Sequence, residues 1–192
     1  EAGIGAVQPL SSGKIFVDQR GPNRTGVALV NPFDDAVLVT LVLRDSFGEE
    51  VGRRTRVFEP HEHLAKYVHE EALFPGTPAG FVGSLTFASG GVGLGAVTLR
   101  QNVNVHGEPI FATLPVVDVS VPEPQPWSVL PQIGAGQGLS TQIVLINPFG
   151  TRVKGRIELV DDHGSPLSLE VDGAESTRFD YLLESHGVAS FT

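Results

Sequence analysis

Two histidines separated by one residue have the spacing of metal ligands. His61 and His63 flank Glu62, and in an extended strand two such residues point to the same face. Two imidazoles on one face bind Zn²⁺ or Cu²⁺ when a third ligand converges on them. Pro60 and the neighbouring charges favour an exposed turn leading into a strand instead.

Paired carboxylates are the second group with possible metal chemistry. Asp34-Asp35 and Asp161-Asp162 offer oxygen ligands, and Ca²⁺ takes six to eight of them. The sequence contains no Asp-x-Asp-x-Asp-Gly loop, so a complete cage requires several loops to converge. Turn formation explains both pairs, and we expect no cofactor. Adventitious Ca²⁺ at Asp161 and Asp162 is the alternative.

Motifs for catalysis are incomplete. Gly91–Ala96 matches the Gly-x-Gly-x-x-Gly/Ala pattern of dinucleotide sites, but strand-like residues follow it where that site needs a helix. Ser84 lacks the Gly-x-Ser-x-Gly setting of a nucleophile elbow. The chain has 0 Cys, which excludes thiol catalysis and disulfides. We therefore predict that the protein is not an enzyme, with no catalytic residues.

One aromatic residue is a candidate for ligand binding. Trp127 is the single tryptophan, and its ring could stack against a sugar. Aromatic residues make up only 7% of the chain, which is few for a sugar-binding platform. Packing in a core or between domains is the alternative role for Trp127.

Composition limits the kinds of partner. The 192 residues include 13 Lys and Arg against 22 Asp and Glu, giving a net charge of −9. Such a chain repels the phosphate backbone, so nucleic-acid binding is disfavoured. No apolar stretch approaches the ~20 residues that a bilayer span needs, and we expect no membrane insertion.

An internal repeat organises the chain. The hexapeptide Ala28–Phe33 reappears as Val144–Phe149, an offset of 147 − 31 = 116 between the asparagines. Two further pairs of blocks follow in order: Leu43–Gly48 with Leu159–Gly164 at the same offset, and His63–Tyr67 with Gly187–Phe191 at an offset of 188 − 64 = 124. These blocks predict two related units.

Strand-like alternation fills both units. Val153, Gly155 and Ile157 alternate with charged residues, as in an antiparallel strand that covers a core on one side. Val37–Leu43 is apolar at nearly every position, which predicts a strand covered on both faces. Turn signals recur about every 8–12 residues, as in a sandwich or barrel. Two of them, Asp45–Gly48 and Asp161–Gly164, place Asp at the entrance of the turn and Gly where a positive φ is needed. One short helix is expected at His69–Phe74.

Prolines around Trp127 mark a linker. We predict an N-terminal strand or tail of a preceding module at 1–11, a first β-sandwich module at 12–118, a Pro-rich linker at 119–131 and a second module at 132–192. The second module lacks counterparts of the first module's later strands. Either the chain continues in a longer protein, or strands from elsewhere complete the module.

Several segments together resemble a known family. Gly26–Pro32, Leu41–Asp45 with Gly48, Thr113–Val117 and Leu130–Gln132 resemble the tandem immunoglobulin-like or fibronectin-III-like modules of secreted bacterial surface proteins. The resemblance implies an all-β fold of two antiparallel sandwiches, the second incomplete, together with export and a spacer or adhesive role. The Cys…Trp…Cys signature of antibody domains is missing, and no catalytic residues are implied.

These observations give two hypotheses. The first is a non-catalytic extracellular structural or adhesive module on the cell surface, a building block of a stalk or filament. Its partners would be other copies or neighbouring modules, joined by strand or end-to-end contacts, and surface glycans or proteins. The alternative is a carbohydrate- or ligand-binding accessory module of a secreted enzyme.

Overall fold

Antiparallel strands make up the regular structure of the chain in the computed structural model, which describes residues 6–104, 106–120, 127–136 and 140–192. The described residues contain no helix, so none of the length and hydropathy of a membrane span is found among them. The first nine strands are β1 (Ser12–Asp18), β2 (Arg24–Val30), β3 (Val37–Asp45), β4 (Glu50–Phe58), β5 (His63–Tyr67), β6 (Val82–Ala88), β7 (Gly95–Val103), β8 (Pro109–Leu114) and β9 (Val117–Asp118). The remaining six are β10 (Ile143–Ile146), β11 (Val153–Glu158), β12 (Leu169–Val171), β13 (Ala174–Ser176), β14 (Arg178–Leu183) and β15 (Val188–Phe191).

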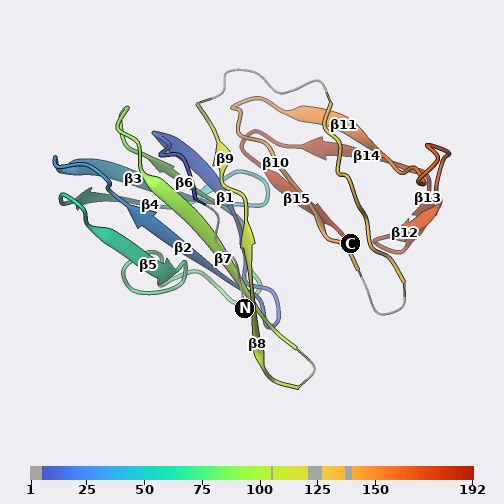
Figure 1. The fold of residues 1–192 in the computed structure, drawn as a ribbon, viewed down its shortest axis with the longest axis horizontal. Helices are drawn as coiled ribbons and strands as arrows, with labels where there is room; N and C mark the ends of the chain where they lie inside the picture. Colours follow the sequence, from blue (N-terminus) through green and yellow to red (C-terminus); the bar gives the residue numbers. More distant parts are fainter. Residues whose placement is uncertain (1–5, 105, 121–126, 137–139) are drawn as a thin grey trace.

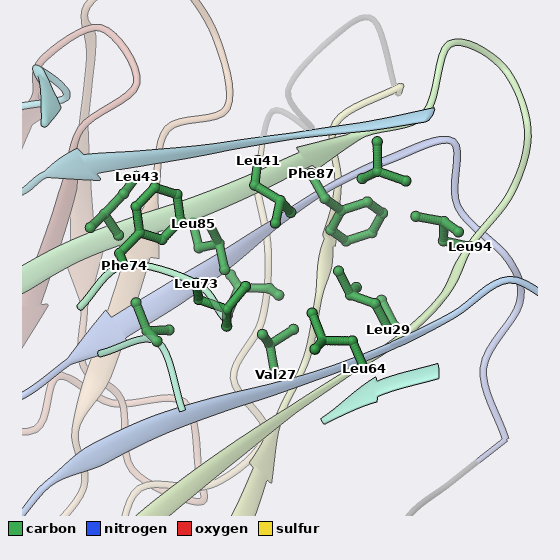
Figure 2. Close-up of a cluster of buried hydrophobic side chains, with 14 of the residues drawn as sticks. Val27, Leu29, Leu41, Leu43, Leu64, Leu73, Phe74, Leu85, Phe87 and Leu94 are labelled. Atoms are coloured by element: carbon green, nitrogen blue, oxygen red, sulfur yellow. The ribbon is translucent and has the colours of Figure 1, made fainter. Parts of the chain in front are cut away.

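Residues 12–118, here called the first segment, form two sheets around one core. Their strand orders are β4-β3-β6-β1-β9 and β5-β2-β7-β8, and all pairings are antiparallel. Side chains from both sheets meet in a buried apolar cluster, with Leu41, Leu85 and Phe87 from one sheet and Val27 and Leu29 from the other (Figure 2). This arrangement is compatible with a β-sandwich, as the alternation of apolar residues indicated.

The predicted cover on both faces of β3 is only partly correct. Val39, Leu41 and Leu43 point into the core, as their period of two requires. On the opposite face Leu38 is 62% exposed, whereas Val42 is buried. The outer face of this sheet is therefore covered along only part of its length.

The helix predicted at His69–Phe74 does not form. Overlapping turns replace it, in which Glu70 N–H donates to the Tyr67 carbonyl and Leu73 N–H to that of Glu70. A six-residue helix gains too few backbone hydrogen bonds to offset its nucleation. The turns instead bury Leu73 and Phe74 in the core.

Residues 127–192, here called the second segment, contain three two-stranded sheets, β10-β15, β11-β14 and β12-β13. The pairing of β10 with β15 corresponds to that of β2 with β5, and β11 with β14 corresponds to β3 with β4. Figure 1 shows this part beside the first segment, with β10 and β15 lying between the first segment and the β11-β14 pair. No counterparts of β6, β7 and β8 occur among the described residues of the second segment.

The repeated turn has the same hydrogen bonds in both segments. Asp45 Oδ1 accepts the N–H groups of residues 47 and 49, and Asp161 Oδ1 accepts those of residues 163 and 165. Each turn ends in a glycine at positive φ, 86° at Gly48 and 80° at Gly164. Both turns therefore follow the expected Asp-to-Gly chemistry.

Register beyond this turn differs from the predicted offset of 124. Asn31 N–H donates to the Glu62 carbonyl, and Asn147 N–H donates to that of Gly187, so the offset is 187 − 62 = 125. The increase from 116 to 125 is nine residues. The β12-β13 hairpin occupies this insertion, because it lies between the repeated turn and β14.

The repeat extends upstream of the predicted start of the second module at 132. Asp18 N–H donates to Thr25 Oγ1, which donates back to the Asp18 carbonyl, and Gly134 and Thr141 make the same pair of bonds at an offset of 116. Residues 127–134 therefore correspond to positions 11–18, which include β1. Of the predicted linker 119–131, residues 121–126 lie outside the described residues, as do residues 1–5 of the predicted N-terminal strand.

Candidate functional site

The predicted histidine pair does not share a strand face. His61 lies in a turn with a φ of 58°, and only His63 belongs to β5. The ring of His61 contacts Asp34 instead, with 3.0 Å between Nε2 and Oδ1. Among the described residues, no third potential ligand groups with these two histidines. The exposed-turn interpretation describes this geometry.

Asp161 and Asp162 form a cluster with His163, because their potential ligand atoms lie within 4.8 Å of one another. One oxygen of Asp161 already accepts two backbone N–H groups of its turn. Asp162 pairs with the His163 ring at 2.6 Å, and both side chains are exposed. The same turn forms around Asp45, so turn formation accounts for the cluster.

Trp127 is 75% exposed and stands at the beginning of the second segment. Val129 and Leu130, on the same stretch of chain, are also exposed. The indole is therefore accessible to a ligand and is not packed in a core.

A buried lysine joins the two segments. Lys14 on β1 is 1% exposed, and its Nζ donates to the carbonyl oxygens of Asn147 at 2.8 Å and His186 at 2.5 Å. Phe16 lies on the same face of β1, and with Ser84 of the adjacent β6 it is also buried. The second segment therefore covers the outer face of the five-stranded sheet at this point.

A backbone contact lies next to the lysine. Val188 N–H donates to the Ser46 carbonyl at 3.0 Å, so the turn at 45–48 of the first segment meets the corner at 185–188 of the second. A Cβ atom on Gly48 would overlap the carbonyl oxygen of Ser185. Glycine at position 48 thus permits both the turn and the close approach of the two segments.

Two arginines extend the junction. The buried carboxylate of Asp18 accepts hydrogen bonds from Arg20 at 3.0 Å and from Arg100 at 3.4 Å. Arg20 also donates to Ser190 Oγ at 3.2 Å, and Arg100 donates to Gln142 Oε1 at 2.5 Å. Burial raises the pKa of Asp18, but the Arg20 hydrogen bonds and the two positive charges outweigh it and leave the pKa below its ordinary value.

Burial also changes the titration of the junction's basic groups. Desolvation, with a contribution from the nearby Arg44 charge, lowers the pKa of Lys14 to about 8. Desolvation and the charges of Lys14 and Arg44 lower the pKa of His186. Both groups are therefore held where their charged forms are disfavoured.

An apolar groove of about 280 Å³ opens in the second segment. Its apolar lining comes from three strands and two stretches of chain outside the strands: Ile133, Ile143, Leu159, Leu169, Val171 and Phe191. Its lining residues Ile143 and Leu159 correspond, at the offset of 116, to Val27 and Leu43 in the core of the first segment. The groove therefore lies at the place where the first segment has its core.

The sequence predicted neither the junction nor its lysine. The partners of Lys14 are main-chain carbonyls more than a hundred positions away, and carbonyls carry no side-chain signature. Phe16, two residues after Lys14 in a strand, was the available signal that the outer face is covered. In comparisons with protein-family models, curated proteins and solved structures, nothing matches this chain.

Proposed function

We propose that this chain is a non-catalytic structural module of the immunoglobulin-like or fibronectin-III-like kind, which joins neighbouring modules into an extracellular stalk or filament. The observation that carries the proposal is the junction between two copies of one repeat. It combines a backbone hydrogen bond from Val188 to Ser46 with the buried Lys14. Extracellular location at a cell surface rests on the resemblance of the sequence to secreted modules.

The parts that meet at the junction belong to the repeat itself. The first segment contributes its turn at 45–48, and the second contributes the corner at 185–188, which corresponds to 60–63. The second segment's own turn at 161–164 and the first segment's corner at 60–63 lie at the surface. A contact between unlike surfaces, each present on every copy, extends head to tail and gives an open filament when its rotation does not close into a ring.

The test is self-association with a variant and a matched control. Gly164 and Gly173 both have positive φ, 80° and 83°, and an added Cβ would touch nothing in either place. Gly164→Ala and Gly173→Ala should therefore cost similar strain, about 1 kcal/mol each. Only position 164 corresponds to Gly48 at the junction.

We expect wild-type protein and Gly173→Ala to form elongated species as concentration rises, seen by sedimentation velocity and electron microscopy. Gly164→Ala should remain monomeric, because its Cβ would obstruct the approach of a neighbouring corner. A wild-type protein that stays monomeric at millimolar concentration would refute assembly by this contact.

A second candidate is binding of a carbohydrate by an accessory module of a secreted enzyme. The exposure of the Trp127 indole favours it, because exposed aromatic rings stack on sugars. A glycan-binding screen with Trp127→Ala as the control tests this candidate. Binding that the variant loses supports it, and absence of binding to any glycan contradicts it.

A further inference from the structure

The second segment has no strand at the position that the central strand β6 holds in the first segment, as far as its described residues go. In the first segment β6 pairs with β1 on one side and with β3 on the other. The corresponding neighbours in the second segment are residues 128–134 and β11, and neither has a strand partner on the side where β6 would lie among the described residues. Both flanks of this position are present, and the described residues of the second segment place no strand between them.

The groove lies where the side chains of that strand would be buried. In the first segment Leu85 of β6 packs beside Leu43, together with Leu73 and Phe74 (Figure 2). Leu159 corresponds to Leu43 at the offset of 116, and it lines the groove. The first segment thus shows which kind of side chain fills this space.

We infer that the second segment binds an extended segment of the β6 type, with large apolar residues at alternate positions, as the central strand between residues 128–134 and β11. This inference rests on the proposed function and specifies one contact by which a module is completed. In β6 the alternating residues are Leu85 and Phe87, both fully buried, while Gly83 lies against the Arg44 carbonyl. Main-chain pairing supplies affinity in such a complex, and alternate side chains supply specificity.

The β12-β13 hairpin limits what else can fit. Its residues Leu169 and Val171 line the groove, and its tip is fixed because Asp172 N–H donates to the Thr192 carbonyl at 2.8 Å. The inserted hairpin therefore shields part of the apolar interior. The free edge of β11 remains, which favours a single added strand over a bulky domain.

The experiment uses a peptide with the sequence of residues 81–89 and a control peptide with Leu85→Asp and Phe87→Asp. Both are added to the full chain, and binding is followed by isothermal calorimetry. Loss of two buried apolar side chains should weaken binding by about a hundredfold or more. Hydrogen exchange should slow at the β11 amides when the unchanged peptide is bound, as expected of strand pairing.

Adjacent residues of the protein supply a second pair of variants. Leu159 is 3% exposed in the groove, whereas Val160 is 58% exposed on the opposite face. Leu159→Asp should abolish peptide binding and Val160→Asp should retain it, with the fold checked by circular dichroism. If Leu159→Asp unfolds, the peptide pair still decides the question.

Failure of the unchanged peptide to bind, or equal binding of both peptides, would overturn the inference. Assembly tested through Gly164→Ala uses a different surface, so its outcome is separate. Filaments without peptide binding would leave the proposed function standing and remove only the strand site.

Discussion

Lys14 makes the free energy of unfolding of this protein rise with pH in the alkaline range. Its pKa is about 8 in the folded chain, against an ordinary value of 10.5. Between these values the folded protein holds a neutral amine, while the unfolded chain still binds the proton. Because the unfolded state then binds more protons, the free energy of unfolding rises with pH across this window.

The magnitude follows from the two pKa values. Their difference, 10.5 − 8, is about 2.5, and at 1.36 kcal/mol for each pKa unit it corresponds to about 3 kcal/mol. Below pH 8 both states carry the proton, so the contribution is constant there. A neutral amine still has two N–H donors for the carbonyls of Asn147 and His186, so the junction keeps its hydrogen bonds.

The assay compares wild-type protein with Lys14→Met by urea unfolding at pH 7 to 10.5. Methionine retains an apolar side chain of similar length without the titrating group. Contributions from groups that both proteins share cancel in the difference. We expect the difference in unfolding free energy, wild type minus variant, to increase by about 3 kcal/mol over this range. A difference that stays flat or falls would refute the burial of a charged Lys14 at the junction.

Three further predictions concern the corners and turns. The pKa of His186 is lowered in the folded protein, so below pH 6.5 the unfolded state gains the proton first and the free energy of unfolding falls. His186→Asn should remove this loss in urea midpoints compared at pH 5 and 7, and an unchanged dependence on acid pH would contradict it. Asn31→Ala should lower the free energy of unfolding in urea by about 2–4 kcal/mol, because the buried amide donates to three carbonyls and accepts the Phe33 N–H. A decrease below about 1 kcal/mol would contradict this role. Gly48→Ala should separate the two segments and raise the radius of gyration in X-ray scattering, whereas Gly90→Ala, also at positive φ but with open space around it, should leave the radius unchanged.

The regular parts of the fold were accessible from the sequence because they depend on local chemistry. Alternation in Val153–Ile157 predicted a strand, and β11 forms there. The Asp45–Gly48 turn was predicted from the carboxylate at its entrance and the glycine at its end, and both act as expected. The helix predicted at 69–74 does not form, because the helical pattern was short and burial of Leu73 and Phe74 in the core outweighed it.

The misplaced register shows why the candidate site was harder to predict. Aligning Leu64 with Val188 by their apolar character gave the offset of 124. In the structure Val188 pairs with Ile146, just as His63 pairs with Val30. Val188 therefore corresponds to His63, at an offset of 188 − 63 = 125. A slip of one residue moves a side chain to the other face of the sheet. Val188 is buried because it meets the first segment at the junction. Its apolar character reflects contact between segments, which a single-strand pattern cannot distinguish from a core position.

The proposed array has junctions that need not be chemically alike. The turn at 161–164 repeats the geometry of 45–48, so the backbone contact can recur with another copy. Lys14, however, corresponds to Leu130 at the offset of 116, and Leu130 is exposed. A junction built on Leu130 would bury an apolar side chain where the first junction buries an amine. The rise of unfolding free energy with pH that Lys14 causes therefore belongs to the junction within this chain. The strength of contacts between copies should not change with pH between 7 and 10.5.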